Sequence, residues 1–143
     1  MKELTLMAVN ENLDTVIDFV NEQLEAEGCS MMAQLQLDIA VEELFINIAS
    51  YAYRPADGPV TIQIDFVGDT ASVVFIDGGR PYNPWDREDP DTTLSAEERD
   101  VGGLGVYIVK QSMNNVGYEY KEGKNILTIE KNIQEEVPMD LDM

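Results

Sequence analysis

The sequence predicts an α+β fold, a two-layer sandwich in which a mixed, mostly antiparallel sheet carries helices on one face. Two pairs of strand-like segments, each joined by a short turn, indicate antiparallel hairpins. Segments with apolar residues at helical spacing lie before and between these hairpins. The 143 residues suffice for one domain with a core. We expect this domain to cover residues 1–131, with an acidic, disordered tail over residues 132–143.

The elements follow in the order strand, two helices, hairpin, long loop, helix, hairpin. The expected strands cover residues 3–8, 60–67, 71–76, 117–121 and 125–131, and the expected helices cover residues 13–27, 31–51 and 106–113. Gly68-Asp69 predicts the turn of the first hairpin, because such dipeptides adopt the backbone angles that a tight turn needs. Ser30 is placed to cap the second helix.

Composition excludes several classes of function. The net charge of −19, from 28 acidic and 9 basic residues, argues against nucleic acid and against anionic membrane surfaces as partners. The sequence has no apolar run long enough to span a membrane, and its start does not resemble a signal peptide. With one cysteine, Cys29, and no histidine, we expect a cytoplasmic protein without a zinc or haem site.

The second helix carries polar residues where apolar ones are expected. Glu43 and Asn47 lie four residues apart on one helix face, with Ser50 close by. The opposite face is apolar, whereas Asp38 and Glu42 form an ordinary solvent-facing sector. A polar stripe bordered by apolar residues is typical of a helix that lines a wet pocket, although an ordinary surface pair gives the same pattern.

Two glycine-containing segments offer further ligand contacts. Asp77 ends an apolar strand and is followed by Gly78, Gly79, Arg80 and Pro81, where a carboxylate can accept hydrogen bonds and glycine permits close approach. The alternative is a plain strand-end turn. The run 102–105, Gly-Gly-Leu-Gly, precedes a helix and can cradle an anion with free N–H groups. The alternative there is a flexible loop end.

Taken together, these residues form a coherent ligand site. Asp77 can read a base amine, the glycines can hold phosphates, and Asn47 can place an oxygen on Mg²⁺, which favours few protein oxygens plus substrate phosphates. Glu43 can then act as a general base toward a hydroxyl group or a water molecule.

The order Glu-x-x-x-Asn, Asp-x-Gly-x-Pro, Gly-Gly-Leu-Gly resembles the GHKL ATPase superfamily. Within it, the sequence is most similar to the bacterial anti-sigma factor serine-protein kinases, which have a histidine kinase-like ATPase domain. The resemblance covers residues 4–131 and implies a Bergerat-type fold with ATP and Mg²⁺ as cofactors. It implies these roles: catalytic base Glu43, magnesium ligand Asn47, adenine-reading Asp77, nucleotide-contacting Gly79, phosphate-side Gly103, Leu104 and Gly105, adenine-side hydroxyl Thr128, and an ATP lid over residues 84–102.

The resemblance also implies partners. Such proteins hold a sigma factor inactive, phosphorylate a serine of an anti-anti-sigma (STAS-type) protein, and form homodimers. This chain departs from the pattern at Tyr51, where many members carry His, and at Asn114-Asn115, where many carry Asp-Glu. Its lid is acidic, which opposes a polyphosphate unless Mg²⁺, Arg87 or Arg99 offsets the charge. Two alternatives therefore remain: a nucleotide-binding module that sequesters a partner without phosphotransfer, and a structural domain that binds no nucleotide.

Overall fold

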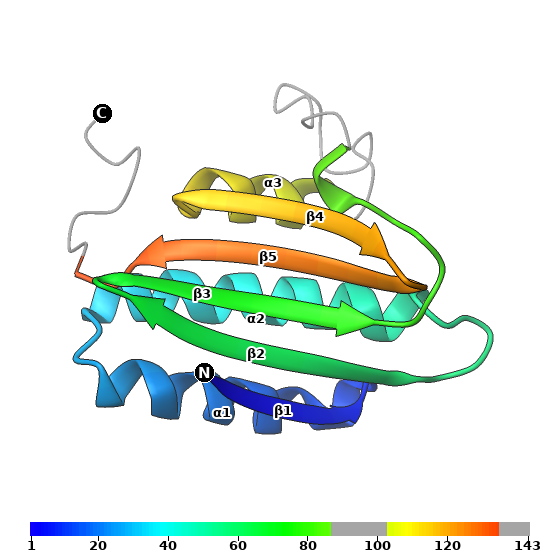
Figure 1. Cartoon of the computed structure of the whole chain (residues 1–143), viewed down its shortest axis with the longest axis horizontal. Helices are drawn as coiled ribbons and strands as arrows, with labels where there is room; N and C mark the ends of the chain where they lie inside the picture. The colour runs from blue at the N-terminus through cyan, green and yellow to red at the C-terminus, as the bar shows by residue number, and fades with distance from the viewer. Residues whose placement is uncertain (87–102, 135–143) are drawn as a thin grey trace.

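The computed structural model describes residues 1–86 and 103–134. A five-stranded sheet forms one layer, and the helices lie together behind it (Figure 1). Its elements are β1 (Lys2–Met7), α1 (Leu13–Ala26), α2 (Met31–Tyr51), β2 (Pro59–Val67), β3 (Thr70–Asp77), α3 (Gly103–Ser112), β4 (Asn115–Lys121) and β5 (Lys124–Asn132), with short 3-10 turns at Asn10–Asn12 and Pro84–Asp86. No helix in the two described ranges is both long and apolar enough to cross a membrane.

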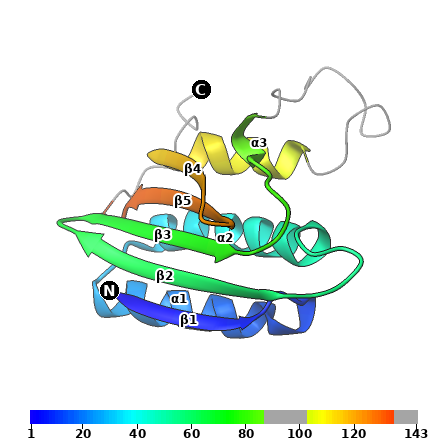
Figure 2. The ribbon, with the colours of Figure 1, turned by 45° about the vertical axis from the view of Figure 1, so that its right-hand side comes forward.

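The sheet has the strand order β1-β2-β3-β5-β4, and each of its four neighbouring pairs is antiparallel. Side chains alternate between the two faces of a strand, and in β3 and β5 every second residue is buried. The buried set packs against the helices, which leaves the other face of the sheet open (Figure 2). This arrangement confirms the predicted α+β sandwich with helices on one face.

Helix α2 crosses the middle of the helical layer and supplies much of the core. The Oγ of Ser30 accepts a hydrogen bond from the backbone N–H of Ala33 at 3.2 Å, so the predicted N-cap is confirmed. Its buried residues are Ala33, Leu37, Ala40, Val41, Leu44, Phe45 and Ile48. Asp38 was predicted on the solvent side, but it is half-buried against α1, where the Nδ2 of Asn21 donates to its Oδ2 at 3.2 Å.

Two element ends differ from the sequence-based expectation. Helix α3 begins at Gly103, so Gly103 and Gly105 lie in its first turn instead of preceding it. Strand β5 runs to Asn132, and the next side chain, Ile133, is only 2% exposed. The backbone N–H of Ile133 donates to the oxygen of Asp69, and its carbonyl accepts from Ser30. The packed chain therefore extends beyond residue 131. Residues 87–102, which hold most of the predicted lid, and residues 135–143 of the predicted tail lie outside the described residues.

Ile133 provides a test of where the packed chain ends. We predict that Ile133→Ala lowers the free energy of unfolding by about 2–4 kcal/mol, because it deletes buried methyl groups and leaves a cavity. Val67→Ala is the control: Val67 is 77% exposed in β2, and its truncation should cost under about 1 kcal/mol. Urea denaturation of both variants measures the difference. Equal losses would contradict the packing of Ile133.

Candidate functional site

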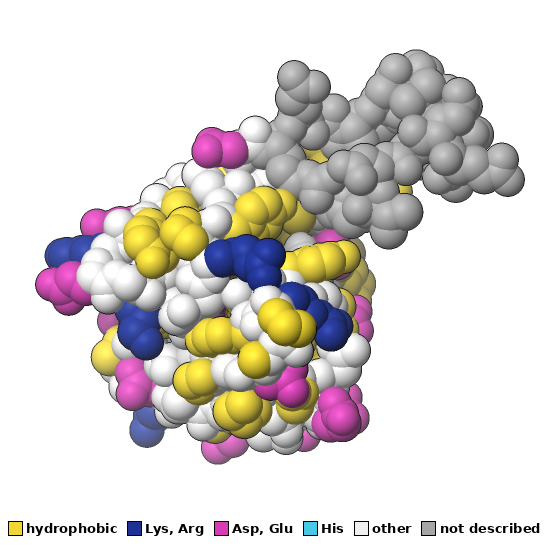
Figure 3. Space-filling view, turned by 90° about the vertical axis from the view of Figure 1, so that its right-hand side faces the viewer, with side chains coloured by type: hydrophobic (Ala, Val, Ile, Leu, Met, Phe, Trp, Pro, Cys, Tyr) yellow, Lys and Arg dark blue, Asp and Glu magenta, His cyan; other side chains and the backbone are white. Residues whose placement is uncertain are grey.

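A pocket of about 380 Å³ opens at the end of the sheet where β3 finishes and β5 begins, next to the C-terminal half of α2. Figure 3 faces this end of the molecule, and apolar side chains there surround a cluster of Lys and Arg side chains. The pocket is lined by Asn47, Ile48, Tyr51, Ala52, Arg54, Asp77, Arg80, Pro81, Tyr82, Pro84, Tyr118, Asn125 and Leu127. Two of the sequence-predicted site residues, Asn47 and Asp77, thus share one cavity.

Asp77 is a buried carboxylate, 5% exposed, in the wall of the pocket. It is the last residue of β3, and the alternation of that strand turns it toward the helices. Its Oδ1 accepts hydrogen bonds from the backbone N–H of Gly79 at 2.8 Å and from the Nδ2 of Asn125 at 3.0 Å. No donor among the described residues is bonded to its Oδ2. Because Oδ2 keeps its acceptor capacity in the wall of the pocket, it is suited to a ligand N–H group.

Asn125 is the residue in this pocket that the sequence reasoning missed. It is 5% exposed and lies directly opposite Asp77 in the pairing of β3 with β5. Its Oδ1 accepts from the hydroxyl of Tyr118 and from the backbone N–H of Tyr82. Burial raises the pKa of Tyr118, and the negative Asp77 also contributes, so the hydroxyl stays a donor. Asparagine is depleted in strands, and its presence in an apolar strand was the available signal.

Gly79 brings the backbone after β3 against the end of α2. A Cβ at this position would collide with the carbonyl group of Ala52, and the N–H of Arg80 donates to that same carbonyl at 3.0 Å. The hydroxyl of Tyr53 accepts from the N–H of Gly78 at 2.7 Å and donates to Pro59. These contacts fix the edge of the pocket, and they explain why the position after Gly78 is a glycine.

Glu43 lies one helical turn before Asn47 on α2, outside the pocket lining. Its carboxylate packs directly against Gly105 in the first turn of α3, where any Cβ would overlap its oxygens. Partial burial raises the pKa of Glu43, and the neighbouring negative charge of Glu42 raises it further. A carboxylate with a raised pKa beside a pocket is a candidate general base.

The predicted phosphate-side residues Gly103, Leu104 and Gly105 form the N-terminal turn of α3. The first backbone N–H groups of a helix have no partner within it, and the helix dipole places partial positive charge there. This turn therefore adjoins Glu43 and offers donors to an anion.

Thr128, which the resemblance places near the adenine, lies on the sheet face turned away from Asp77. It pairs with Val74, three residues before Asp77, so the two side chains point to opposite faces of the sheet. Thr128 is absent from the pocket lining, where Asn125 and Leu127 of the same strand are found.

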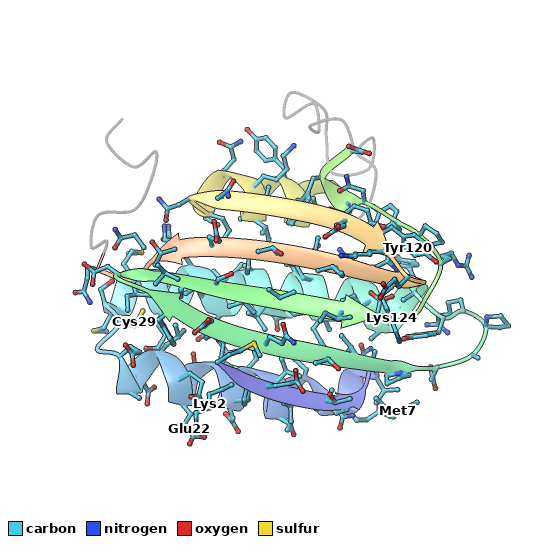
Figure 4. The ribbon with its side chains drawn as sticks, viewed as in Figure 1. Lys2, Met7, Glu22, Cys29, Tyr120 and Lys124 are labelled. Atoms are coloured by element: carbon cyan, nitrogen blue, oxygen red, sulfur yellow. The ribbon has the colours of Figure 1, made fainter. Side chains whose placement is uncertain are left out.

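Basic side chains gather around the pocket although the chain as a whole is strongly acidic. Arg54 and Arg80 line it, and a guanidinium N–H of Arg80 donates to the backbone oxygen of Arg54. The Nζ of Lys124 lies 3.3 Å from the position that a Cβ on Gly78 would occupy. Figure 4 places Lys124 at the same end of the sheet. This local positive charge favours an anionic ligand.

Comparison with protein families assigns the domain. A family model described as the histidine kinase-like ATPase domain matches residues 6–131. The chain belongs to this family. The histidine kinase-like ATPase domain of this chain also resembles a solved structure, the histidine kinase AdeS of Acinetobacter baumannii, with a TM-score of 0.53 and 12% sequence identity over 94% of this chain and 70% of that one. At such low identity this likeness shows the fold alone.

Curated relatives of this ATPase domain include bacterial protein kinases. The chain is 29% identical to the serine-protein kinase RsbW of Listeria monocytogenes over 105 residues, which cover 70% of this chain and 67% of that protein. It is 26% identical to the serine/threonine-protein kinase BtrW of Bordetella bronchiseptica over 102 residues, which cover 70% and 71%.

The raised pKa of Glu43 gives a stability prediction. A folded-state pKa above the ordinary value of 4.5 means that folding favours the protonated form. That stabilisation is complete below the unfolded pKa and is lost as pH rises through the folded pKa. Glu43→Gln, which stays neutral, should therefore raise the melting temperature at pH 7 on the order of 1–3 °C, a small effect because Glu43 is only half-buried.

Below pH 4.5 the difference in melting temperature between Glu43→Gln and the parent protein should vanish, because Glu43 is then protonated in both states. Differential scanning calorimetry across this pH range measures both values. Glu22→Gln on the exposed side of α1 is the control, with no pH-dependent gain expected. A destabilised Glu43→Gln protein at pH 7 would contradict the assignment.

Proposed function

We propose that this chain is an ATP-binding anti-sigma regulatory factor with protein-serine kinase activity toward an anti-anti-sigma partner. The observation that carries the proposal is the Asp77 carboxylate, buried in the pocket wall with Oδ1 held by two donors and Oδ2 open to a ligand. The family assignment supports ATP as that ligand, and the names of the similar RsbW and BtrW proteins support serine as the acceptor.

The residues present fit a nucleoside triphosphate. Oδ2 of Asp77 would accept a hydrogen bond from the exocyclic amine of adenine. Ile48 and Leu127, which line the pocket, would make apolar contact with the base. Gly79 keeps the backbone beside the base free of a side chain. The first turn of α3, from Gly103 to Gly105, would supply N–H donors to the phosphates.

Asn47 is the residue we assign to Mg²⁺. It lines the same pocket as Asp77 and follows Glu43, which packs on Gly105, by one turn of α2. Among the described residues no group of three His, Cys, Asp or Glu side chains could hold a metal ion, so the ion would depend on phosphate oxygens together with the amide oxygen of Asn47. When bound, Mg²⁺ and ATP would supply charge neutralisation and the phosphoryl group for transfer.

Glu43 would serve as the base. It would accept the proton of the partner's serine hydroxyl as that oxygen forms its bond to phosphorus and the bond to the departing diphosphate oxygen breaks. Its raised pKa brings it closer to the operating pH than an ordinary glutamate, which favours proton transfer. The contact with Gly105 would hold the carboxylate next to the phosphate-binding turn.

The proposed regulatory role involves a sigma factor and a second copy of this chain. The chain would hold a sigma factor inactive, and it would act as a homodimer in the cytoplasm. We propose that residues 1–131 form the whole catalytic domain, to which Ile133 adds packing. No direct contact with nucleic acid is proposed, because the net charge of −19 opposes it.

A nucleotide-binding module that sequesters its partner without phosphotransfer is the second candidate. The observation that favours it is the acidic composition of residues 86–100, which contain seven acids and two arginines. If this segment is the ATP lid that the resemblance implies, its negative charge would oppose a triphosphate through electrostatic repulsion.

Phosphotransfer separates the two candidates. We predict that the protein, with γ-labelled ATP, Mg²⁺ and its co-purifying STAS-type partner, transfers label to a partner serine. Glu43→Gln should reduce the rate by about 10²- to 10⁴-fold, because it removes the base, while ATP binding persists. Glu22→Gln is the control and should leave the rate unchanged, since Glu22 is exposed on α1.

Two outcomes would contradict parts of this account. An unchanged rate in Glu43→Gln would exclude Glu43 as the base. ATP binding by the parent protein without any labelled product would favour the sequestering module over the kinase.

A further inference from the structure

The side chain of Asn125 on β5 is hydrogen-bonded to several groups of the surrounding protein. Its Nδ2 donates to Asp77 Oδ1 at 3.0 Å, to the carbonyl oxygen of Arg80 at 3.0 Å and to that of Gly79 at 3.4 Å. Its Oδ1 accepts from the N–H of Tyr82 at 3.1 Å and from the hydroxyl of Tyr118. The side chain thus links the end of β3, the segment that follows it, and β4.

These partners fix the orientation of the amide. The N–H of Tyr82 can only donate, so it must face the Asn125 oxygen. The carbonyl oxygens of Gly79 and Arg80 can only accept, so they must face Nδ2. A flipped amide would place donor against donor and acceptor against acceptor, each of which is costly in a buried site. Nδ2 therefore always points at Asp77.

The fixed amide also fixes the carboxylate. Asp77 Oδ1 accepts hydrogen bonds from the Nδ2 of Asn125 and from the N–H of Gly79, and these two donors hold the carboxylate in place. The hydrogen-bonding capacity of the Asn125 amide is taken up by protein groups, so Asn125 has nothing left to offer a ligand. Among the described residues, Oδ2 of Asp77 has no hydrogen bond to the protein, and it is an acceptor.

We propose that Asn125 is the positioning residue that makes the site selective for purines with a 6-amino group, by holding Asp77 so that its Oδ2 acceptor faces that group. This inference rests on the proposed nucleotide site. A 6-aminopurine presents a donor to Oδ2, whereas a purine with a 6-carbonyl presents an acceptor to it. Tyr118 supports the same arrangement, because its hydroxyl holds the Asn125 oxygen on the far side from Asp77.

The amino group of the ligand distinguishes a positioning role of Asn125 from a merely structural one. If Asn125 only stabilised the fold, its loss would weaken the binding of ATP and the binding of an analogue without the amino group by the same factor. If Asn125 positions Asp77, its loss should weaken the binding of ATP more than that of the analogue, because only ATP donates a hydrogen bond from its amino group to Asp77. The ratio of the two dissociation constants therefore reports the coupling between Asn125 and the amino group.

The experiment is isothermal titration of the full chain with ATP–Mg²⁺ and with purine riboside triphosphate–Mg²⁺, which lacks the 6-amino group. For the parent protein we expect ATP to bind about 10- to 100-fold more tightly, the value of one hydrogen bond to a charged group. In Asn125→Ala this ratio should fall to about threefold or less.

Asn115→Ala is the matched control, because the Nδ2 of Asn115 also donates to a carboxylate, that of Glu130, but outside the pocket. Its ratio should equal that of the parent protein. If Asn125→Ala does not fold, Tyr118→Phe, which removes only the hydroxyl on Asn125, should still lower the ratio.

An undiminished ratio in both Asn125→Ala and Tyr118→Phe would overturn the inference and leave the proposed ATP site standing. Failure of the parent protein to bind either nucleotide would overturn the proposed function itself, and this inference with it.

Discussion

The pairing of Asp77 with Asn125 across β3 and β5 is the contact on which the site depends. The register of this antiparallel pair places both residues on the helix-facing side of the sheet, at the end where the two strands leave the core. A carboxylate there loses solvation, and it is stable because Asn125 and the N–H of Gly79 both bond to it. The same bonds leave its second oxygen for a ligand. The Asp77–Asn125 pair thus allows a buried carboxylate to line a pocket.

A second close contact defines the other half of the site. Helix α3 can begin directly against Glu43 only because Gly105 lacks a side chain. The groups proposed to bind the base and the phosphates therefore come from different elements, the sheet end and the α2–α3 contact, and α2 also carries the pocket residue Asn47. This division means that a change in how α3 packs on α2 would alter Glu43 without moving Asp77.

Much of the fold could be predicted because its signals are local. The alternation of residues 60–67 and 71–76 and the apolar face of α2 each follow from burial on one side of an element. Asn47 and Asp77 stood out because each interrupts such a pattern. Thr128 and Asn125 show what the sequence pattern alone could not predict. Both lie in one strand three residues apart, and only the strand's register against β3 decides which of them faces the pocket. The start of α3 was missed for a similar reason, because the helix tolerates its glycines through packing on Glu43, which is remote in sequence.

The central claim is that the Asp77 pocket binds ATP, and direct titration tests it. Isothermal titration of the parent protein with ATP–Mg²⁺ should give one site per chain. In Asp77→Asn the affinity should fall by about tenfold or more. The asparagine replaces one acceptor oxygen of the carboxylate with an NH₂ group, which would face the donors that the carboxylate accepts. Asp69→Asn, at the opposite end of β3 in the turn from β2, should bind like the parent protein. Equal affinity of Asp77→Asn and the parent protein, or no binding by either, would contradict the claim.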